Sequence, residues 1–361
     1  MDRPALPPPA ALRSSPLHWV RRNLFSTWYN SLLTLLILAA AWTLVPGLAA
    51  WLVGHAVWSG DAAACRAEGA GACWAFVAEK WRFSLFGTYP VEQHWRPTLA
   101  MLLVVGLLLG SADRRLWGRP LLLLWPVVLL LAGLLMQGGV LGLETVPTYL
   151  WGGLPLTLGL SVVGLGLAFP LGVLLALGRT SAMPVFRALC TVYIELVRGV
   201  PLISILFMAS VMIPLFLPQD VTVDKLLRAQ IGLVLFAAAY LAEVVRGGLQ
   251  AIPKGQVEAA SALGLSYWQR TRMIVLPQAL ALVIPPLVNT FIGFFKDTSL
   301  VVIIGLLDLL GAAKSALTDP AWRGFYREAY LFVAVIYFIF CYALSRYSRH
   351  LEAQLSKGRR R

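Results

Sequence analysis

The stretch QAIPKGQVEAASALGLSYWQRTRMIVLP, residues 250–277, lies between two apolar segments and carries the most informative pattern in the chain. Pro253 suits a helix start, and the small-residue run after it favours a helix that ends at a C-terminal cap on Gly264. Ser266 then opens a capping-box pattern for a second helix, which Pro277 is expected to end. The sequence therefore predicts a helix–turn–helix whose small side chains let another surface approach closely.

On either side of this stretch the chain is strongly apolar. Of its 361 residues, 59% are hydrophobic and 13% are charged, more apolar surface than a soluble domain of this length could bury. A spanning helix takes about 20 apolar residues. Eight apolar segments can be drawn, at residues 30–53, 98–112, 120–143, 154–177, 188–217, 229–249, 280–312 and 329–348. The sequence predicts an all-α integral membrane protein with about eight transmembrane helices, the seventh long and broken.

The formal charge of +13 is distributed unevenly between these segments. When the N-terminus is placed in the cytoplasm, the external segments hold equal numbers of basic and acidic residues, and the excess positive charge falls on the cytoplasmic side. This asymmetry follows the positive-inside rule, so both termini are predicted to be cytoplasmic. The charge therefore gives no reason to expect a nucleic-acid partner.

The chain divides into three parts that differ in their apolar segments and motifs. Residues 1–28 are expected to form a cytoplasmic tail. Residues 29–150 hold three apolar segments and an external loop at 54–97, and are interpreted as accessory transmembrane helices. Residues 151–361 hold five segments and every motif that suggests chemistry, and are interpreted as a transport core.

Two cysteines, Cys65 and Cys73, lie in the predicted external loop. An oxidising compartment permits a disulfide between them, and two free thiols are the alternative. Their spacing is not that of a metal site.

One motif, E-x-x-R-G, occurs twice, at Glu195–Arg198 and again 48 residues later at Glu243–Arg246. Both copies lie toward the predicted cytoplasmic end of their segment. Glu and Arg three residues apart share a helix face and can pair. Two interpretations stay open: each pair neutralises itself near the membrane interface, or the pairs form part of an inner gate.

The 250–277 stretch resembles the EAA loop of ABC importer permeases, in which EAA is followed by three residues, Gly, nine residues and I-x-L-P. The matching residues are Glu258, Ala259, Ala260, Gly264, Ile274, Leu276 and Pro277. The resemblance implies a five-helix, MetI-like core and a coupling helix that inserts into a groove on the ATPase. The alternative is an interfacial amphipathic helix without a partner.

Three further motifs resemble the polar amino-acid uptake group of these permeases. They are GGLPLTL at 152–158, YIELVRGVPL at 193–202 and FKDTSL at 295–300. The extra N-terminal segments and the loop CRAEGAGACWAF further resemble the larger permease subunit of the general L-amino acid transport system.

This resemblance implies a transport subunit of the bacterial inner membrane that imports polar L-amino acids and is not itself an enzyme. The implied partners are an ABC ATPase dimer, a second and non-identical permease subunit, a periplasmic amino-acid-binding protein and membrane lipid. The chain contains no G-x-x-x-x-G-K-[ST] motif, so ATP and Mg are expected on the partner ATPase and no cofactor is expected here.

Lys296 and Asp297 are adjacent inside the seventh segment, roughly 15 Å from Pro286 at 1.5 Å per residue, which places them near the midplane. Charges at that depth are costly and usually functional. An acid and a base could answer the ammonium and carboxylate of an amino acid, with Thr298 and Ser299 satisfying the backbone where the helix breaks. The alternative is that the two charges hold the break by pairing with neighbouring helices.

Two other classes of protein remain as alternatives. An ion-gradient-driven secondary transporter would also carry charges near the midplane, but it would have no use for an EAA loop. A membrane enzyme is disfavoured because no metal-ligand cluster or nucleophile motif is visible and the four histidines are scattered along the chain. No metal site is expected.

Overall fold

The computed structural model describes residues 16–140, 142–218 and 221–359. The first 15 residues of the predicted cytoplasmic tail therefore lie outside the described residues. The regular secondary structure of the described part is helical apart from a two-residue strand, β1 (Leu307–Asp308). The chain separates into two compact units, one ending at Ala75 and the other beginning at Phe76.

The α-helices follow one another along almost the whole described chain. In chain order they are α1 (Pro16–Leu24), α2 (Trp28–Ala49), α3 (Trp74–Phe86), α4 (Trp95–Ala112), α5 (Arg119–Gln137), α6 (Gly153–Arg179), α7 (Pro184–Gly199), α8 (Leu202–Leu215), α9 (Lys225–Gln250), α10 (Lys254–Ala262), α11 (Tyr267–Arg270), α12 (Leu276–Leu282), α13 (Ile284–Asp297), α14 (Leu309–Ala316) and α15 (Tyr326–Arg359).

Seven helices of the described residues are long and apolar enough to cross a membrane, and α7 with α8 makes an eighth span if the bent pair counts as one. The predicted helical membrane fold is confirmed, with one difference. The fifth apolar segment, expected to run through 188–217, is two helices bent by 105°. Pro201 lacks the N–H that would continue α7 and pushes Val200 into an extended conformation (φ −104°, ψ 133°), so the helix ends there.

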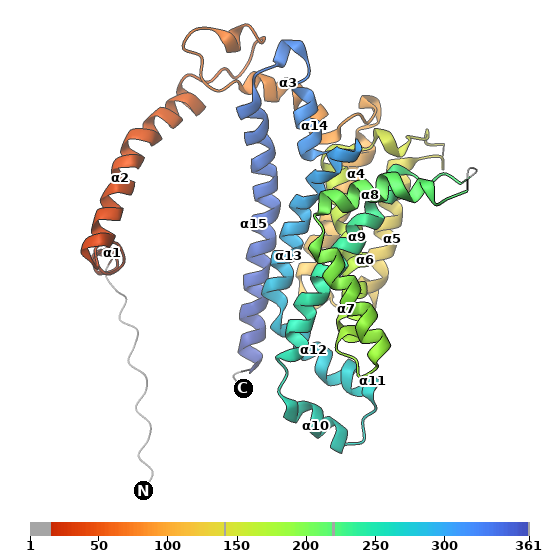
Figure 1. Cartoon of the computed structure of the whole chain (residues 1–361). Coiled ribbons are helices and arrows are strands. Elements are labelled where there is room, and N and C mark those ends of the chain that lie inside the picture. Colours follow the sequence, from red (N-terminus) through yellow and green to blue (C-terminus); the bar gives the residue numbers. More distant parts are fainter. Residues whose placement is uncertain (1–15, 141, 219–220, 360–361) are drawn as a thin grey trace. The chain divides into compact units, whose positions relative to one another are not determined.

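α6 and α9 pack against each other at the centre of the second unit, with α13 beside them and α15 packed against α13 (Figure 1). Small side chains permit the close approach of α6 and α9, as is common between membrane helices. A Cβ on Gly172 of α6 would lie 2.9 Å from the Leu241 Cβ and 3.0 Å from the Ala238 carbonyl oxygen of α9. Ala238, Leu241 and Ala242 are completely buried in this contact.

The seventh apolar segment is broken, as the sequence predicts. α13 ends at Asp297 and continues as a 3₁₀ turn, η7 (Thr298–Ile304), before β1 and α14. β1 pairs in parallel with Gly152 and Gly153 at the start of α6. The break therefore joins the end of α13 to the entrance of α6.

In the first unit, a disulfide between Cys65 and Cys73 closes part of the predicted external loop, and the two Cα atoms lie 5.5 Å apart. Val57 forms an isolated β-bridge with Cys73. The rings of Trp58 and Trp74 stack with their centroids 5.9 Å apart.

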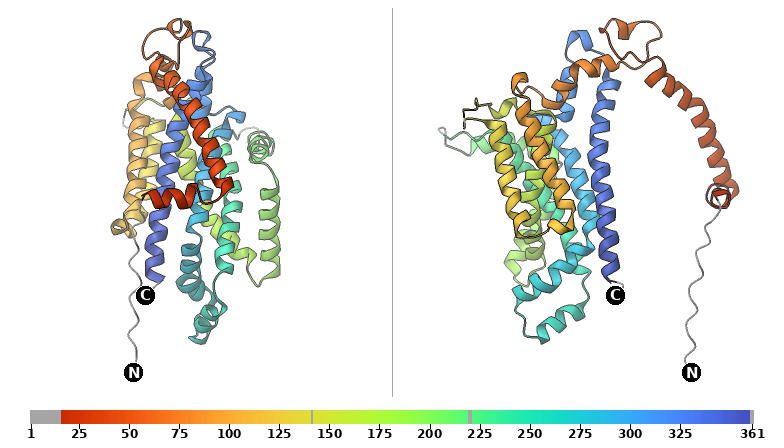
Figure 2. Two further views of the ribbon diagram at one scale, coloured as in Figure 1. Left: turned by 90° about the vertical axis from the view of Figure 1, so that its left-hand side faces the viewer. Right: turned by 180° about the vertical axis from the view of Figure 1, so that it is seen from behind.

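The second unit places the 250–277 loop at one end of its helical bundle. α10 and α11 lie at the same end as the start of α7 and the end of α15, whereas α14 lies at the opposite end (Figures 1 and 2). The loop is thus presented away from the spanning helices.

The α6–α9 contact predicts the effect of adding a single methyl group. Gly172→Ala should lower the midpoint of thermal unfolding of the purified protein by several degrees, because overpacking a tight contact costs about 1–3 kcal/mol. Gly166→Ala is the matched control on the same helix, because a Cβ there meets no atom within 4 Å. Equal midpoints for the two variants would contradict the packing described for α6 and α9.

Candidate functional site

The first helix of the 250–277 loop, α10, begins after Pro253 and ends in a left-handed cap at Gly264 (φ +74°). The Leu265 amide donates to the Ala260 carbonyl (3.2 Å), and the Gly264 amide donates to the Ser261 carbonyl (3.0 Å). This Schellman pairing is typical of a helix that stops at glycine. It fixes the turn between α10 and α11.

The second helix, α11, has the predicted capping box: the Ser266 hydroxyl accepts from the Gln269 amide, and the Gln269 side chain accepts from the Ser266 amide. The expectation that Pro277 ends this helix is wrong. A π-helical turn at 271–275 leads directly into α12, and Pro277 lies in the first turn of α12. Proline is tolerated in a first turn because the missing N–H has no partner there in any case.

Some of the EAA residues are exposed on the surface of the loop, and the others are buried or half-buried beneath it. Glu258 and Ala259 are exposed on α10, and Gly264 and Pro277 are also exposed, whereas Ala260 is buried. The other two residues of the pattern, Ile274 and Leu276, are half-buried.

Large apolar side chains lie on the surface beside the EAA residues. Leu263, Trp268 and Met273 are between 66% and 78% exposed. Sequence reasoning missed them, although Leu263 and Trp268 stand in the partly apolar run LGLSYW at 263–268. Exposed apolar side chains of this size suit contact with another protein.

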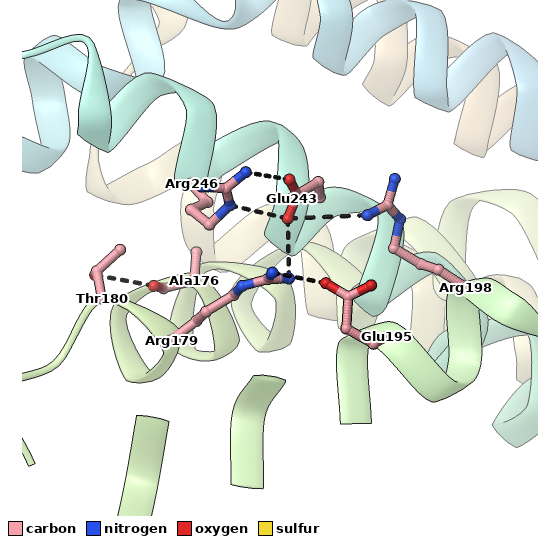
Figure 3. Close-up of polar contacts among 7 residues, drawn as sticks. All are labelled: Ala176, Arg179, Thr180, Glu195, Arg198, Glu243 and Arg246. Atoms are coloured by element: carbon pink, nitrogen blue, oxygen red, sulfur yellow. Dashed lines mark hydrogen bonds and ion pairs between the residues drawn. The ribbon is translucent and has the colours of Figure 1, made fainter. Parts of the chain in front are cut away.

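The second E-x-x-R-G motif is the centre of an ion-pair cluster at the ends of α6, α7 and α9 (Figure 3). Arg246 pairs with Glu243 on the same helix, as expected, through Nη2 and through Nε at 3.0 Å. Arg179 of α6 reaches the same carboxylate through Nη1 at 3.2 Å. Arg198 of α7 lies 3.9 Å from it. One carboxylate therefore faces three guanidinium groups from three helices.

The first motif does not pair within itself. Glu195 accepts from Arg179 at 2.6 Å. Arg198 turns instead toward Glu243 and the ring of Tyr240, 5.5 Å from its centroid. Arg198 stands in the last turn of α7, where its side chain reaches α9. The expected Glu195–Arg198 pair is thus replaced by contacts between helices.

Arg179 is the member of this cluster that sequence reasoning missed. It ends the apolar run of α6, and the only signal was a basic residue at the end of a span. The arginine side chains of the cluster are 19% to 34% exposed, so water screens them less than it screens a surface pair. Loss of the Glu243 carboxylate would leave Arg198 and Arg246 without their ionic partner, while Arg179 keeps Glu195, and this is destabilising.

The charged pair of the seventh segment stands at the end of α13. Lys296 is exposed and Asp297 is half-buried. Among the residues that the structure describes, neither has an ionic partner within 4.0 Å.

Of the two residues after this pair, Thr298 is buried and Ser299 is half-buried. The Thr298 hydroxyl donates to the Phe295 carbonyl at 2.8 Å, which satisfies one backbone group where α13 gives way to the 3₁₀ turn. A side-chain hydroxyl thus satisfies a backbone carbonyl at the break, as a break inside a membrane-spanning segment requires.

Comparison with known proteins shows relatives along nearly the whole chain. The inner membrane amino-acid ABC transporter permease protein YhdY of Escherichia coli (strain K12) is 50% identical over 361 residues, covering 98% of this chain and 97% of the relative. The glutamate/glutamine/aspartate/asparagine transport system permease protein BztC of Rhodobacter capsulatus is 40% identical, covering 95% and 94%.

A solved structure is also similar to part of the chain. The crystal structure of an amino acid ABC transporter with histidines matches with a TM-score of 0.50 and 30% identity, covering 56% of this chain and 92% of that one. The model of the family "Binding-protein-dependent transport system inner membrane component" matches residues 168–357. The chain therefore belongs to this family, and is the membrane-embedded permease subunit of an ABC importer with the MetI-like fold.

Proposed function

We propose that this permease carries polar amino acids such as glutamate, glutamine and aspartate across the inner membrane. The observation that carries the proposal is the end-to-end similarity to two permeases, one named for amino acids and one for glutamate, glutamine, aspartate and asparagine. As in the rest of the family, the chain carries no cofactor, and ATP with its Mg is bound by a partner ATPase.

The same proposal includes an assembly and an orientation. A periplasmic binding protein delivers the substrate, an ATPase dimer docks on the 250–277 loop, and a second, non-identical permease subunit completes the pore. Both termini lie in the cytoplasm, which puts the 250–277 loop there and the 54–97 loop outside. In this arrangement residues 29–150 are accessory helices around a transport core at 151–361. The uneven distribution of basic residues supports this orientation.

The exposed EAA face is the proposed coupling site. Glu258 and Ala259 stand on the outer surface of α10, and Gly264 sets the turn that holds α10 against the rest of the loop. Exposed apolar side chains occur in the same loop at Leu263, Trp268 and Met273. A rigid helix–turn–helix with such a face can transmit a displacement of the ATPase to α9 and α12, the helices on either side of it.

The ion-pair cluster around Glu243 is the proposed inner gate. It joins the ends of α6, α7 and α9 on the side that the proposed orientation makes cytoplasmic. Partly buried ion pairs have discrete bonded and separated states, which suits an element that opens once in each cycle. Arg179 of α6 pairs with Glu195 of α7 and with Glu243 of α9, so α7 cannot leave α9 without breaking one of these two pairs.

The unpaired charges of α13 are the proposed substrate contacts. A charge inside a membrane-spanning segment needs a partner, and Lys296 and Asp297 find none among the described residues of this chain. An amino acid supplies both an ammonium and a carboxylate. The hydrogen bond from the Thr298 hydroxyl to the Phe295 carbonyl supports the helix break that follows the pair.

Reconstitution tests the transport function and the coupling site together. Proteoliposomes that hold the complete complex should take up glutamate only when ATP and binding protein are supplied. Gly264→Val should abolish co-purification of the ATPase and reduce uptake at least tenfold, because a β-branched residue is strained at φ +74°.

Gly264→Asn is the matched control, because asparagine tolerates the left-handed conformation, and it should retain most of the uptake. Uptake driven by an ion gradient without ATP would favour the secondary-transporter alternative. Normal ATPase binding by the valine variant would remove the coupling assignment and leave the amino-acid proposal standing.

Substitution of Asp297 separates a substrate contact from a structural charge. Asp297→Asn keeps nearly the same volume, and the carboxylate has no ionic partner to lose among the described residues, so thermal stability should change little while glutamate uptake falls about tenfold or more. Ser299→Ala, two residues further along, is the control and should keep most uptake. A variant with full uptake, or one that loses stability and uptake in parallel, would contradict the substrate contact.

A further inference from the structure

An open pocket of about 470 Å³ lies where α6 and α9 end beside α7, and every residue that lines it is polar. The lining residues are Arg179, Thr180, Arg187, Thr191, Arg246 and Gln250. The lining contains three guanidinium groups and no carboxylate. A pocket of this composition favours an anion.

The carboxylates next to the pocket do not balance its positive charge. Glu195 and Glu243 are shared by Arg179, Arg198 and Arg246. Arg187 has no ionic partner among the described residues, and its Nε and Nη2 atoms both donate to the Ser181 carbonyl oxygen, at 2.8 and 2.6 Å. Three arginines thus share two carboxylates and Arg187 has none, which leaves two positive charges uncompensated.

Hydrogen-bonding groups in the pocket also lack partners. The side chains of Thr191 and Gln250 make no hydrogen bond to any described residue, although both can donate. Guanidinium groups bind phosphate in a bidentate fashion. The pocket therefore offers a tetrahedral oxyanion several donors from three helices.

The surface beside the pocket suits lipid. The side of α7 away from Arg187 carries a row of exposed apolar residues at the spacing of one helix face. They are Val185, Leu189, Val192 and Leu196, each between 62% and 69% exposed. α7 thus presents an apolar side to acyl chains and a polar side to the pocket.

We propose that this pocket binds the phosphate of an anionic phospholipid headgroup. The proposal rests on the orientation given above, which puts the pocket at the cytoplasmic boundary of the membrane, where basic pockets between spanning helices take such headgroups. A phosphate held there faces Arg179 and Arg246, the same side chains that hold Glu243. Lipid occupancy is therefore linked to the ion-pair cluster and to the end of α6.

Lipid retention by the purified complex tests the site directly. Native mass spectrometry during a titration with phosphatidylglycerol should show one saturable lipid site, and Arg187→Gln should weaken its apparent affinity about fivefold, the effect of one basic residue. Thr191→Val, which keeps the charge, should weaken it by a smaller factor. Arg119→Gln is the control, an equal charge change at an exposed position of another predicted cytoplasmic loop, and should leave the affinity unchanged.

Three results would overturn the proposal. Equal losses in the Arg187 and Arg119 variants would show diffuse surface attraction, and an absence of saturable phosphatidylglycerol binding by the unaltered complex would remove the site. Displacement of the lipid by an equal concentration of inorganic phosphate would identify a site for a free anion. Because retention is measured on solubilised complex, a failure here is distinct from a failure of the orientation, which an accessibility map of the termini would reveal.

Discussion

The rest of the second unit depends on one interaction, the ion pairing of the Glu243 carboxylate with the three arginines around it. Arg179, Arg198 and Arg246 come from α6, α7 and α9, so one acidic group holds together the ends of three helices. Partly buried cations without a counter-charge are unstable. The cluster therefore either stays closed around Glu243 or opens as a unit, in a state where other groups compensate the charges of the arginines.

The surrounding structure makes this arrangement possible. Gly172 and the alanines of α9 bring α6 and α9 into close contact, which sets Arg179 within reach of Glu243. The bend at Pro201 then turns the chain away after α7, leaving Arg198 at a free helix end beside α9. Beyond α9 the chain passes directly into the EAA loop, so the carboxylate at the centre of the cluster stands on the helix that precedes the coupling site.

Much of this fold could be predicted from sequence because its signals are local. Segment length and hydropathy predicted the spans, and the caps at Gly264 and Ser266 predicted the turn between α10 and α11. The continuation of the helix past Pro277 was not predicted. A π-helical turn at 271–275 joins α11 to α12, and no residue pattern in the sequence indicates such a turn.

The parts that could not be predicted are those that depend on distant residues meeting. The E-x-x-R-G repeats indicated pairs within each helix, whereas Glu195 pairs with Arg179, which lies in another helix and in no motif. The bend at Pro201 was hidden inside a continuous apolar run. The arginine-lined pocket likewise draws on three helices whose packing the sequence did not reveal.

A cross-link between α6 and α7 tests most directly whether the cluster is a gate that opens during transport. A Cβ on Gly178 would lie 3.5 Å from the Cβ of the native Cys190, within the range of a disulfide. Oxidised Gly178→Cys complex should lose ATP-driven uptake and regain it after reduction, while unaltered complex given the same oxidant and reductant keeps its activity. Full uptake by a completely cross-linked complex would contradict the gate.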